Sequence, residues 1–165
     1  MTRDETEEVL ARAGQATDEA FDLFEAALTC ALHEDPSRDG APARALMEDA
    51  VRRLGERLKL DRPEEALTET LSGDLHFTGD LINYNHPANA DLIAVAERRK
   101  GLPVALGVFY IAAARRCGLK VFGVDFPAHF LLRVETEDGP IALDPFSHGR
   151  IVLPSELTSR ALQAG

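Results

Sequence analysis

The chain has 165 residues, of which 45% are hydrophobic and 28% charged, and its formal net charge is −10 at pH 7. Nucleic-acid-binding proteins usually show a basic footprint and an acidic surface repels anionic membranes, so we expect neither a nucleic-acid nor a membrane partner. The length suits one domain with its own core. We expect residues 1–16 to be a flexible acidic N-terminal segment and residues 17–165 to form a single domain.

The N-terminal sequence and the cysteines indicate a cytoplasmic protein. The first eight residues are mostly acidic and polar and lack the apolar core of a signal peptide. Cys30 and Cys117 stand alone in the sequence, so they form neither a disulfide framework nor a metal-binding spacing. The histidines are also isolated. We therefore expect a reduced protein with no metal and no cofactor, as a monomer or weak homo-oligomer.

The N-terminal half predicts a layer of helices. After a frayed helix over residues 2–13, a second helix is predicted to start at a cap formed by Thr17 or Asp18. Its apolar residues recur at helical spacing: Phe21, Phe24, Leu28, Ala31 and Leu32. A third helix over residues 41–60 is expected to bury a stripe of Leu46, Ala50, Leu54 and Leu58.

Two short helices are predicted over residues 63–73 and 88–98, on either side of an irregular polar loop. The loop contains Asp74, His76, Asp80, Asn83, Tyr84, Asn85 and His86. Polar loops often border functional sites, although asparagine and aspartate also make turns by bonding their own backbone. Asn83, Tyr84 and Asn85 are the loop residues that we expect to contribute to binding.

The stretch from Leu102 to Ala114 predicts the central helix, because it contains no charged side chain and must be buried on every side. Pro103 suits the first helical turn, and Gly118 suits a left-handed C-cap. The following sequence predicts an antiparallel sheet, with strands over residues 119–126, 130–136 and 141–143 and a fourth over 150–153. A final helix is expected over residues 155–163.

Several motifs in this order resemble the SirB-type transglutaminase-like domain family of bacteria. They are Phe-Thr-Gly-Asp at 77–80, Asn-Ala-Asp-Leu at 89–92, Arg-Arg-Lys-Gly-Leu-Pro at 98–103, Pro-Ala-His-Phe-Leu at 127–131 and Asp-Pro-Phe at 144–146. The resemblance covers about residues 21–152. It implies an α+β, papain-like fold with an N-terminal helical layer and a central buried helix packed on a three- to four-stranded antiparallel sheet. It also implies further tetratricopeptide-like helices after this domain, whereas only about one helix is predicted after the sheet here.

The resemblance further implies the positions of a Cys-His-Asp triad. His129 occupies the position of the base and Asp144 that of the residue orienting it, but the start of the central helix carries no cysteine, serine or threonine. Ala105 stands near the position of the nucleophile, where many SirB-type members have serine. Cys117 lies at the other end of this helix, about 20 Å away, and Cys30 is expected in the core, with a small chance of lying under the cleft. We therefore expect a pseudoenzyme.

The spacing of the sheet residues leaves the contact between His129 and Asp144 open. A two-residue turn at Asp138-Gly139 would set Asp144 opposite Arg133, as a structural ion pair, and leave His129 about 13 Å along the strand. A turn nearer Thr136-Glu137 would bring the imidazole and the carboxylate together.

The sequence therefore supports a non-catalytic module that binds a protein or peptide partner. We expect the binding residues to be Asn83, Tyr84, Asn85, Pro103, Ala105, Phe126, Pro127 and Phe146. The alternative is a hydrolase or acyltransferase that uses His129 and Asp144 with water or Cys30. A structural module of a larger complex is a third hypothesis.

Overall fold

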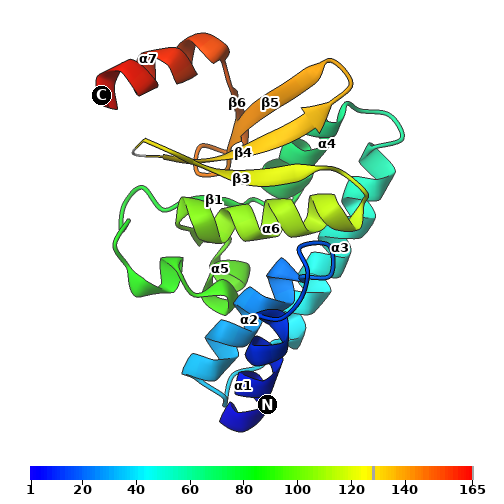
Figure 1. Ribbon diagram of the computed structural model, residues 1–165, viewed down its shortest axis with the longest axis vertical. Helices are drawn as coiled ribbons and strands as arrows, with labels where there is room; N and C mark the ends of the chain where they lie inside the picture. The colour runs from blue at the N-terminus through cyan, green and yellow to red at the C-terminus, as the bar shows by residue number, and fades with distance from the viewer. Residues whose placement is uncertain (128, 165) are drawn as a thin grey trace.

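In the computed structural model, which describes residues 1–127 and 129–164, one buried helix separates a layer of helices from an antiparallel sheet (Figure 1). This helix is α6, Pro103–Arg116. Helices α2 (Leu23–Glu34), α3 (Ala41–Arg57) and α5 (Leu92–Arg98) pack against it from one side, and the sheet packs against the other. This arrangement confirms the expected α+β fold. Ala128, part of the turn expected before His129, and Gly165 lie outside the described residues.

The body of α6 is enclosed and its N-terminal end is open. Every residue from Ala105 to Ala114 is buried, as its uncharged sequence predicts. Gly118 has a φ of +79°, which confirms the left-handed residue expected after the helix. In the first turn, however, Val104 is 57% exposed. The apolar stretch is therefore not buried along its whole length, because the sheet does not cover its first turn.

The N-terminal helix α1, Arg3–Ala13, agrees with the helix expected over residues 2–13. It begins with a capping box in which the Thr2 hydroxyl accepts from the Glu5 N–H and the Glu5 carboxylate accepts from the Thr2 N–H. Thr6 is fully buried, and its hydroxyl lies 2.8 Å from Nδ1 of His33 on α2. The flexibility expected for residues 1–16 stays a prediction.

The start of α2 differs from the prediction. Residues 18–20 form a turn, so the cap is Asp22, whose carboxylate accepts from the Glu25 N–H at 3.0 Å, rather than Thr17 or Asp18. Phe21 consequently lies before the helix, whereas the other four residues of the expected stripe are buried. Helix α3 ends at Arg57, before the predicted residue 60.

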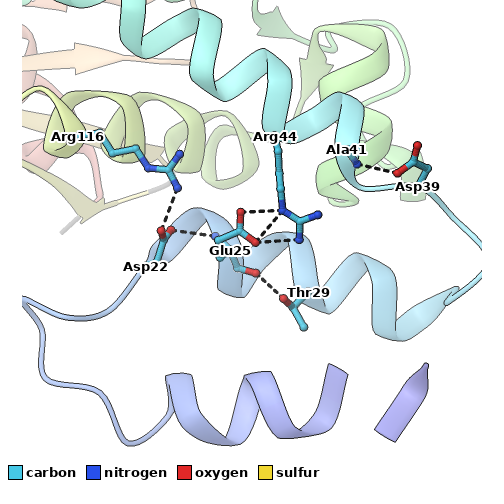
Figure 2. Close-up of polar contacts among 7 residues, drawn as sticks. All are labelled: Asp22, Glu25, Thr29, Asp39, Ala41, Arg44 and Arg116. Atoms are coloured by element: carbon cyan, nitrogen blue, oxygen red, sulfur yellow. Dashed lines mark hydrogen bonds and ion pairs between the residues drawn. The ribbon is translucent and has the colours of Figure 1, made fainter. Parts of the chain in front are cut away.

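Charged side chains connect the helical layer to α6 (Figure 2). Arg44 on α3 donates from Nε and Nη2 to the Glu25 carboxylate on α2, at 2.9 to 3.1 Å. Arg116 at the end of α6 donates to Asp22 at 3.0 Å. These contacts link the three helices at the edge of the core, where the groups are partly exposed and each pair contributes only modestly to stability.

The segment between α3 and α6 consists of short elements. Helix α4, Pro63–Thr68, continues into the π-helix η1, Glu69–Asp74. The two-residue strands β1, Thr78–Gly79, and β2, Lys100–Gly101, pair in parallel. The 3₁₀ helix η2, Pro87–Asn89, precedes α5, so the helix predicted over residues 88–98 is divided in two.

The sheet is an antiparallel meander of β3 (Val121–Phe126), β4 (His129–Thr136), β5 (Gly139–Asp144) and β6 (Arg150–Val152), in that spatial order. Helix α7, Pro154–Ala164, follows β6 and lies on the side of the sheet away from α6 (Figure 1). The end of β3 and the start of β4 lie at the same end of the molecule as the first turn of α6. That end carries the candidate site.

The Phe130 ring fixes the distance between α6 and the sheet. It lies between Gly107 of α6 and Gly123 of β3, and a Cβ added at Gly107 would come within 2.5 Å of the ring. A Cβ at Gly123 would come within 2.6 Å. Two glycines are therefore required for β4 to approach α6 this closely, and the residue before Phe130 is His129.

Candidate functional site

A cleft of about 740 Å³ lies where the first turn of α6, the ends of the sheet strands and the polar loop meet. Six of the residues expected at the site line this cleft: Tyr84, Pro103, Phe126, His129, Asp144 and Phe146. The structure thus brings together residues from the loop, the central helix and three strands or their ends. The cleft is lined by both apolar and polar side chains, and the polar ones are Asp125, His129, Asp144, Ser147 and Arg160.

The other four expected site residues do not line this cleft. Asn83 and Asn85 are exposed on the loop, and Pro127 is exposed next to the undescribed Ala128. Ala105 is only 8% exposed and belongs to the core, so its neighbour Val104 is the residue that opens to the cleft. An apolar helix sequence does not show which face of its first turn the sheet leaves uncovered.

The structure adds six residues to the cleft: Leu102, Val104, Asp125, Phe130, Ser147 and Arg160. Ser147 directly follows the Asp-Pro-Phe motif, so the motif provided a signal for it. Arg160 comes from α7, and its polar helical neighbourhood gives no signal of a site. Only the return of the chain over the sheet places this guanidinium in the cleft.

The β4–β5 turn corrects the register considered from the sequence. Its two residues are Glu137 and Asp138, and Thr136 pairs with Gly139. The Thr136 hydroxyl donates to the Gly139 carbonyl at 2.6 Å, and the φ of Gly139 is +111°. These contacts favour a turn one residue earlier than Asp138-Gly139.

This register sets the geometry of His129 and Asp144. Leu132 pairs with Leu143, so the continued ladder places Asp144 opposite Leu131, two residues or about 6.6 Å from His129 along the strand. The alternative of an ion pair between Arg133 and Asp144 is wrong, because Arg133 lies opposite Ala142 and bonds Glu135 at 2.6 Å. Among the described residues, no hydrogen bond joins His129 to Asp144.

The Asp144 carboxylate instead organises the turn that follows β5. Its Oδ1 accepts from the N–H groups of Phe146 and Ser147 at 3.0 and 3.2 Å, and its Oδ2 accepts from the Ser147 hydroxyl at 3.0 Å. The side chain is nearly buried, so these contacts compensate for its lost hydration. Asp144 therefore acts as a local cap that places Phe146 in the cleft.

Side-chain alternation indicates where His129 points. Phe130 contacts Gly107 of α6, and adjacent residues of a strand face opposite sides. His129 is consequently directed to the α7 side of the strand, at the end of the sheet where the cleft begins. It lines the cleft together with Pro103 and Val104 of the first turn of α6.

Neither cysteine lines the cleft. Cys117 follows the C-terminal end of α6, where its thiol lies 3.4 Å from the Val51 carbonyl and burial raises its pKa. Cys30 is exposed on α2, in a separate groove that also contains Pro87 and Asp91, so the expectation that it belongs to the core is wrong. It lies on the solvent side of α2, opposite the residues that pack on α6.

Tyr110 of α6 is a buried polar group close to the site. Burial raises the pKa of its phenol, and the negative charge of Asp144 raises it further. The phenol therefore stays neutral over the pH range in which the protein is folded, and it supplies no base or nucleophile to the cleft.

The loop that carries Tyr84 is held by a buried polar network. Asn89 is fully buried, and its side-chain amide donates to the carbonyls of Asn83 and Tyr84 at 2.7 and 3.1 Å. Arg98 of α5 donates to the Asn89 side-chain oxygen and to Asp80, both at 2.9 Å. The network thus fixes the loop backbone at Asn83 and Tyr84, and with it the position of the Tyr84 ring in the cleft.

An aromatic contact connects the loop to Phe146, on another side of the cleft. The Tyr84 and Phe146 rings meet edge to face, with their centroids 5.6 Å apart. Phe146 also covers Gly79, where a Cβ would come within 2.4 Å of the ring. Gly79 donates its N–H to the Phe146 carbonyl at 3.0 Å. The wall formed by these two rings therefore depends on both the loop network and β1.

Acid should weaken this loop network. The Asn83 N–H, and then the side chains of Asn89 and Arg98, hold the pKa of Asp80 below its usual value. A lowered pKa in the folded state contributes stability above about pH 4 and loses it as the pH falls through the folded value. We expect Asp80→Asn to destabilise the protein at about pH 7, and this effect to shrink towards about pH 3.

Urea unfolding of both proteins at several pH values measures this difference. Asp18→Asn, at an exposed residue outside the network, should change stability little throughout. A wild-type advantage over Asp80→Asn that stays constant across this pH range would contradict a role for the Asp80 charge.

The histidines do not assemble into a metal centre. In the part of the chain that the structure describes, no group of three or more His, Cys, Asp or Glu side chains is placed to hold a metal ion. His86 caps η2 by accepting from the Ala88 N–H, and His148 lies near Ser72 and Thr78 at 3.4 Å. Both have local structural contacts.

Comparison with known proteins agrees with the geometry. Residues 41–165 match the family model described as the transglutaminase-like superfamily. The chain belongs to the transglutaminase-like superfamily. The match begins at α3 and includes α6, the sheet and every residue that lines the cleft. No solved structure matches the chain.

Sequence relatives include UPF0162 proteins and a mammalian protein. The chain is 36% identical to a UPF0162 protein of Xylella fastidiosa over 148 residues, which cover 87% of this chain and 53% of the relative. A UPF0162 protein of Pseudomonas aeruginosa is 33% identical, over 80% of this chain and 49% of the relative. F-box only protein 21 of Mus musculus is 35% identical over 69 residues, 42% of this chain and 11% of that protein. The chain thus spans about half the length of the UPF0162 relatives.

None of the helices among the described residues combines the length and the apolar character that crossing a membrane requires.

Proposed function

We propose that this transglutaminase-like domain, of the SirB type, is a non-catalytic module whose cleft binds a peptide segment of a protein partner. The observation that carries the proposal is the composition of the first turn of α6. Pro103 and Val104 present apolar side chains to the cleft, where an acyl-transferring member would need a nucleophile. Cys30 and Cys117 lie elsewhere in the fold.

The shape and chemistry of the cleft support a peptide ligand. Tyr84, Phe126 and Phe146 supply aromatic surface, which contributes strongly to recognition at small conformational cost. The loop that carries Tyr84 also presents Leu81 and Ile82, which are 82% and 84% exposed. Neighbouring exposed apolar side chains are a feature of surfaces that bind other proteins.

The test is a selection of random displayed peptides against the whole chain, followed by NMR mapping of a recovered peptide. We expect the shifted resonances to surround the cleft, and Val104→Glu to weaken binding at least tenfold, because it places a charge on an apolar wall. Val104 is more than half exposed, so this variant should fold. Leu60→Glu, at a 90% exposed position away from the cleft, should bind normally.

The enzymatic alternative gives a different result. A hydrolase would cleave the recovered peptides. In an acyltransferase that uses Cys30, a thiol-reactive probe would label Cys30, and this labelling would require His129. We expect Cys30 to react at the same rate in wild type and His129→Ala. Labelling or cleavage that is lost in His129→Ala would overturn the non-catalytic proposal, as would a failure of Val104→Glu to reduce binding.

A further inference from the structure

We propose that Arg160 forms a carboxylate-binding subsite in the cleft, so that the bound segment carries an acidic group. This proposal rests on the peptide-binding function above and specifies the chemistry of the ligand. The source of the carboxylate is either the C-terminus of a peptide or the side chain of an aspartate or glutamate. Both present the same planar anion to the guanidinium.

The Arg160 guanidinium faces the cleft with donors unused. Its side chain is 22% exposed, while its Nη1 is fully buried without a hydrogen-bond partner among the described residues. Nη1 is closed to solvent, so a bound anion would pair with the other guanidinium nitrogens. Their one carboxylate contact among the described residues is the 3.9 Å approach of Glu156 to Nη2.

The nearest carboxylate in the fold is committed elsewhere. Glu156 approaches Nη2 of Arg160 only to 3.9 Å, and it receives hydrogen bonds from Arg150 at 2.9 and 3.1 Å and from the Leu153 N–H at 3.1 Å. Arg150, followed by the Leu153 N–H, lowers the pKa of Glu156 to about 2, so this carboxylate stays charged and paired with Arg150. Arg160 is thus left as the arginine available to a ligand.

The acidic residues of the cleft leave room for an anion at this position. Asp144 is occupied by the N–H groups of Phe146 and Ser147 and by the Ser147 hydroxyl. Asp125 is exposed on β3, where water screens its charge. His129 lines the same cleft and offers a second nitrogen donor to a bound carboxylate. Arg160 and His129 are thus the nitrogen-bearing side chains of the cleft that can donate to a bound carboxylate.

Three tripeptide probes separate the sources of the carboxylate: acetyl-Ala-Ala-Phe with a free C-terminal carboxylate, the same peptide as its amide, and the amide of acetyl-Ala-Glu-Phe. Each is titrated into the whole ¹⁵N-labelled chain. We expect at least one carboxylate-bearing probe to bind about tenfold more tightly than the neutral amide. The probe with the larger gain identifies the α-carboxylate or the side-chain carboxylate as the preferred source.

Arginine variants test whether Arg160 is responsible. Arg160→Gln should reduce the preference for carboxylate to near unity, and Arg160→Lys should retain part of it. Arg52→Gln removes the same charge from an exposed position on α3 and should retain the full preference. A variant that still binds the neutral amide as wild type does is folded at the cleft.

The outcomes also distinguish this subsite from the proposed function. Equal binding of all three probes to the wild type, with shifts at the cleft, would overturn the carboxylate subsite and leave the peptide-binding function intact. An unchanged preference in Arg160→Gln would also overturn it. Absence of binding by every probe would also overturn the subsite. The peptide-binding function is tested separately, by the selection of displayed peptides and the Val104→Glu variant.

Discussion

Gly107→Ala should lower the free energy of unfolding by roughly 1–3 kcal/mol, an effect at the upper end for a single added methyl group. The added Cβ would lie 2.5 Å from the Phe130 ring, a separation that real Cβ atoms do not tolerate. The ring cannot move directly away from α6 without a clash, since Gly123 lies close against its opposite side. Urea unfolding monitored by circular dichroism measures the loss.

The matched control is another helical glycine. A Cβ at Gly55 of α3 would meet nothing within 4 Å, so Gly55→Ala should raise the free energy of unfolding by roughly 0.4–1 kcal/mol. Combining Gly107→Ala with Phe130→Ala should cost less than the sum of the two single changes, because the small side chain removes the clash. Equal effects of the two glycine substitutions would contradict the close approach of β4 to α6.

Asn89→Ala should cost roughly 2–3 kcal/mol of stability and also weaken peptide binding in the cleft. The substitution removes the two hydrogen bonds that the side chain donates to the carbonyls of Asn83 and Tyr84 and the one it accepts from Arg98. The Tyr84 carbonyl then loses its hydrogen-bond partner among the described residues, whereas the Asn83 carbonyl keeps the His86 N–H and Arg98 keeps Asp80. The Tyr84 ring then loses the backbone support that holds it against Phe146.

Asn85→Ala is the control for this prediction, since Asn85 is an exposed asparagine of the same loop. It should change stability by less than about 0.5 kcal/mol. NMR should show the resonances of Phe146 and its neighbours shifting in Asn89→Ala and staying in place in Asn85→Ala. A similar small effect of both substitutions would mean that the loop backbone does not depend on the network.

These two predictions address different walls of one site. Phe130 and its glycines place β4, and therefore His129, next to the open end of α6. The network of Asn89, Arg98 and Asp80 places the aromatic wall on the other side. A rigid frame of this kind is expected of a binding cleft, where order in the free state reduces the entropic cost of association.

The UPF0162 relatives are about twice as long as this chain, and their other halves lie outside the comparison. The proposals above therefore concern the cleft of this domain. The similarity to F-box only protein 21 covers 42% of this chain and 11% of that longer protein.

The sequence by itself determined the main elements of the fold. A helix without charged side chains cannot face water, so residues 105–114 had to be its buried centre. Alternating apolar residues and turn signals likewise predicted the strands and placed His129 and Asp144 at strand ends. Six of the cleft residues were expected from the sequence: four lie in the motifs that resemble SirB-type domains, Tyr84 lies in the polar loop and Phe126 precedes the motif of His129.

Only the tertiary structure decided how the groups of the site meet. A turn shifted by one residue changed the partner of Asp144, because hairpin register depends on local hydrogen bonds and the freedom of one glycine. Periodicity likewise does not show which face a neighbour covers. Contacts between segments far apart in the chain therefore decide that Val104 is exposed, that Ala105 is buried and that Arg160 lies in the cleft.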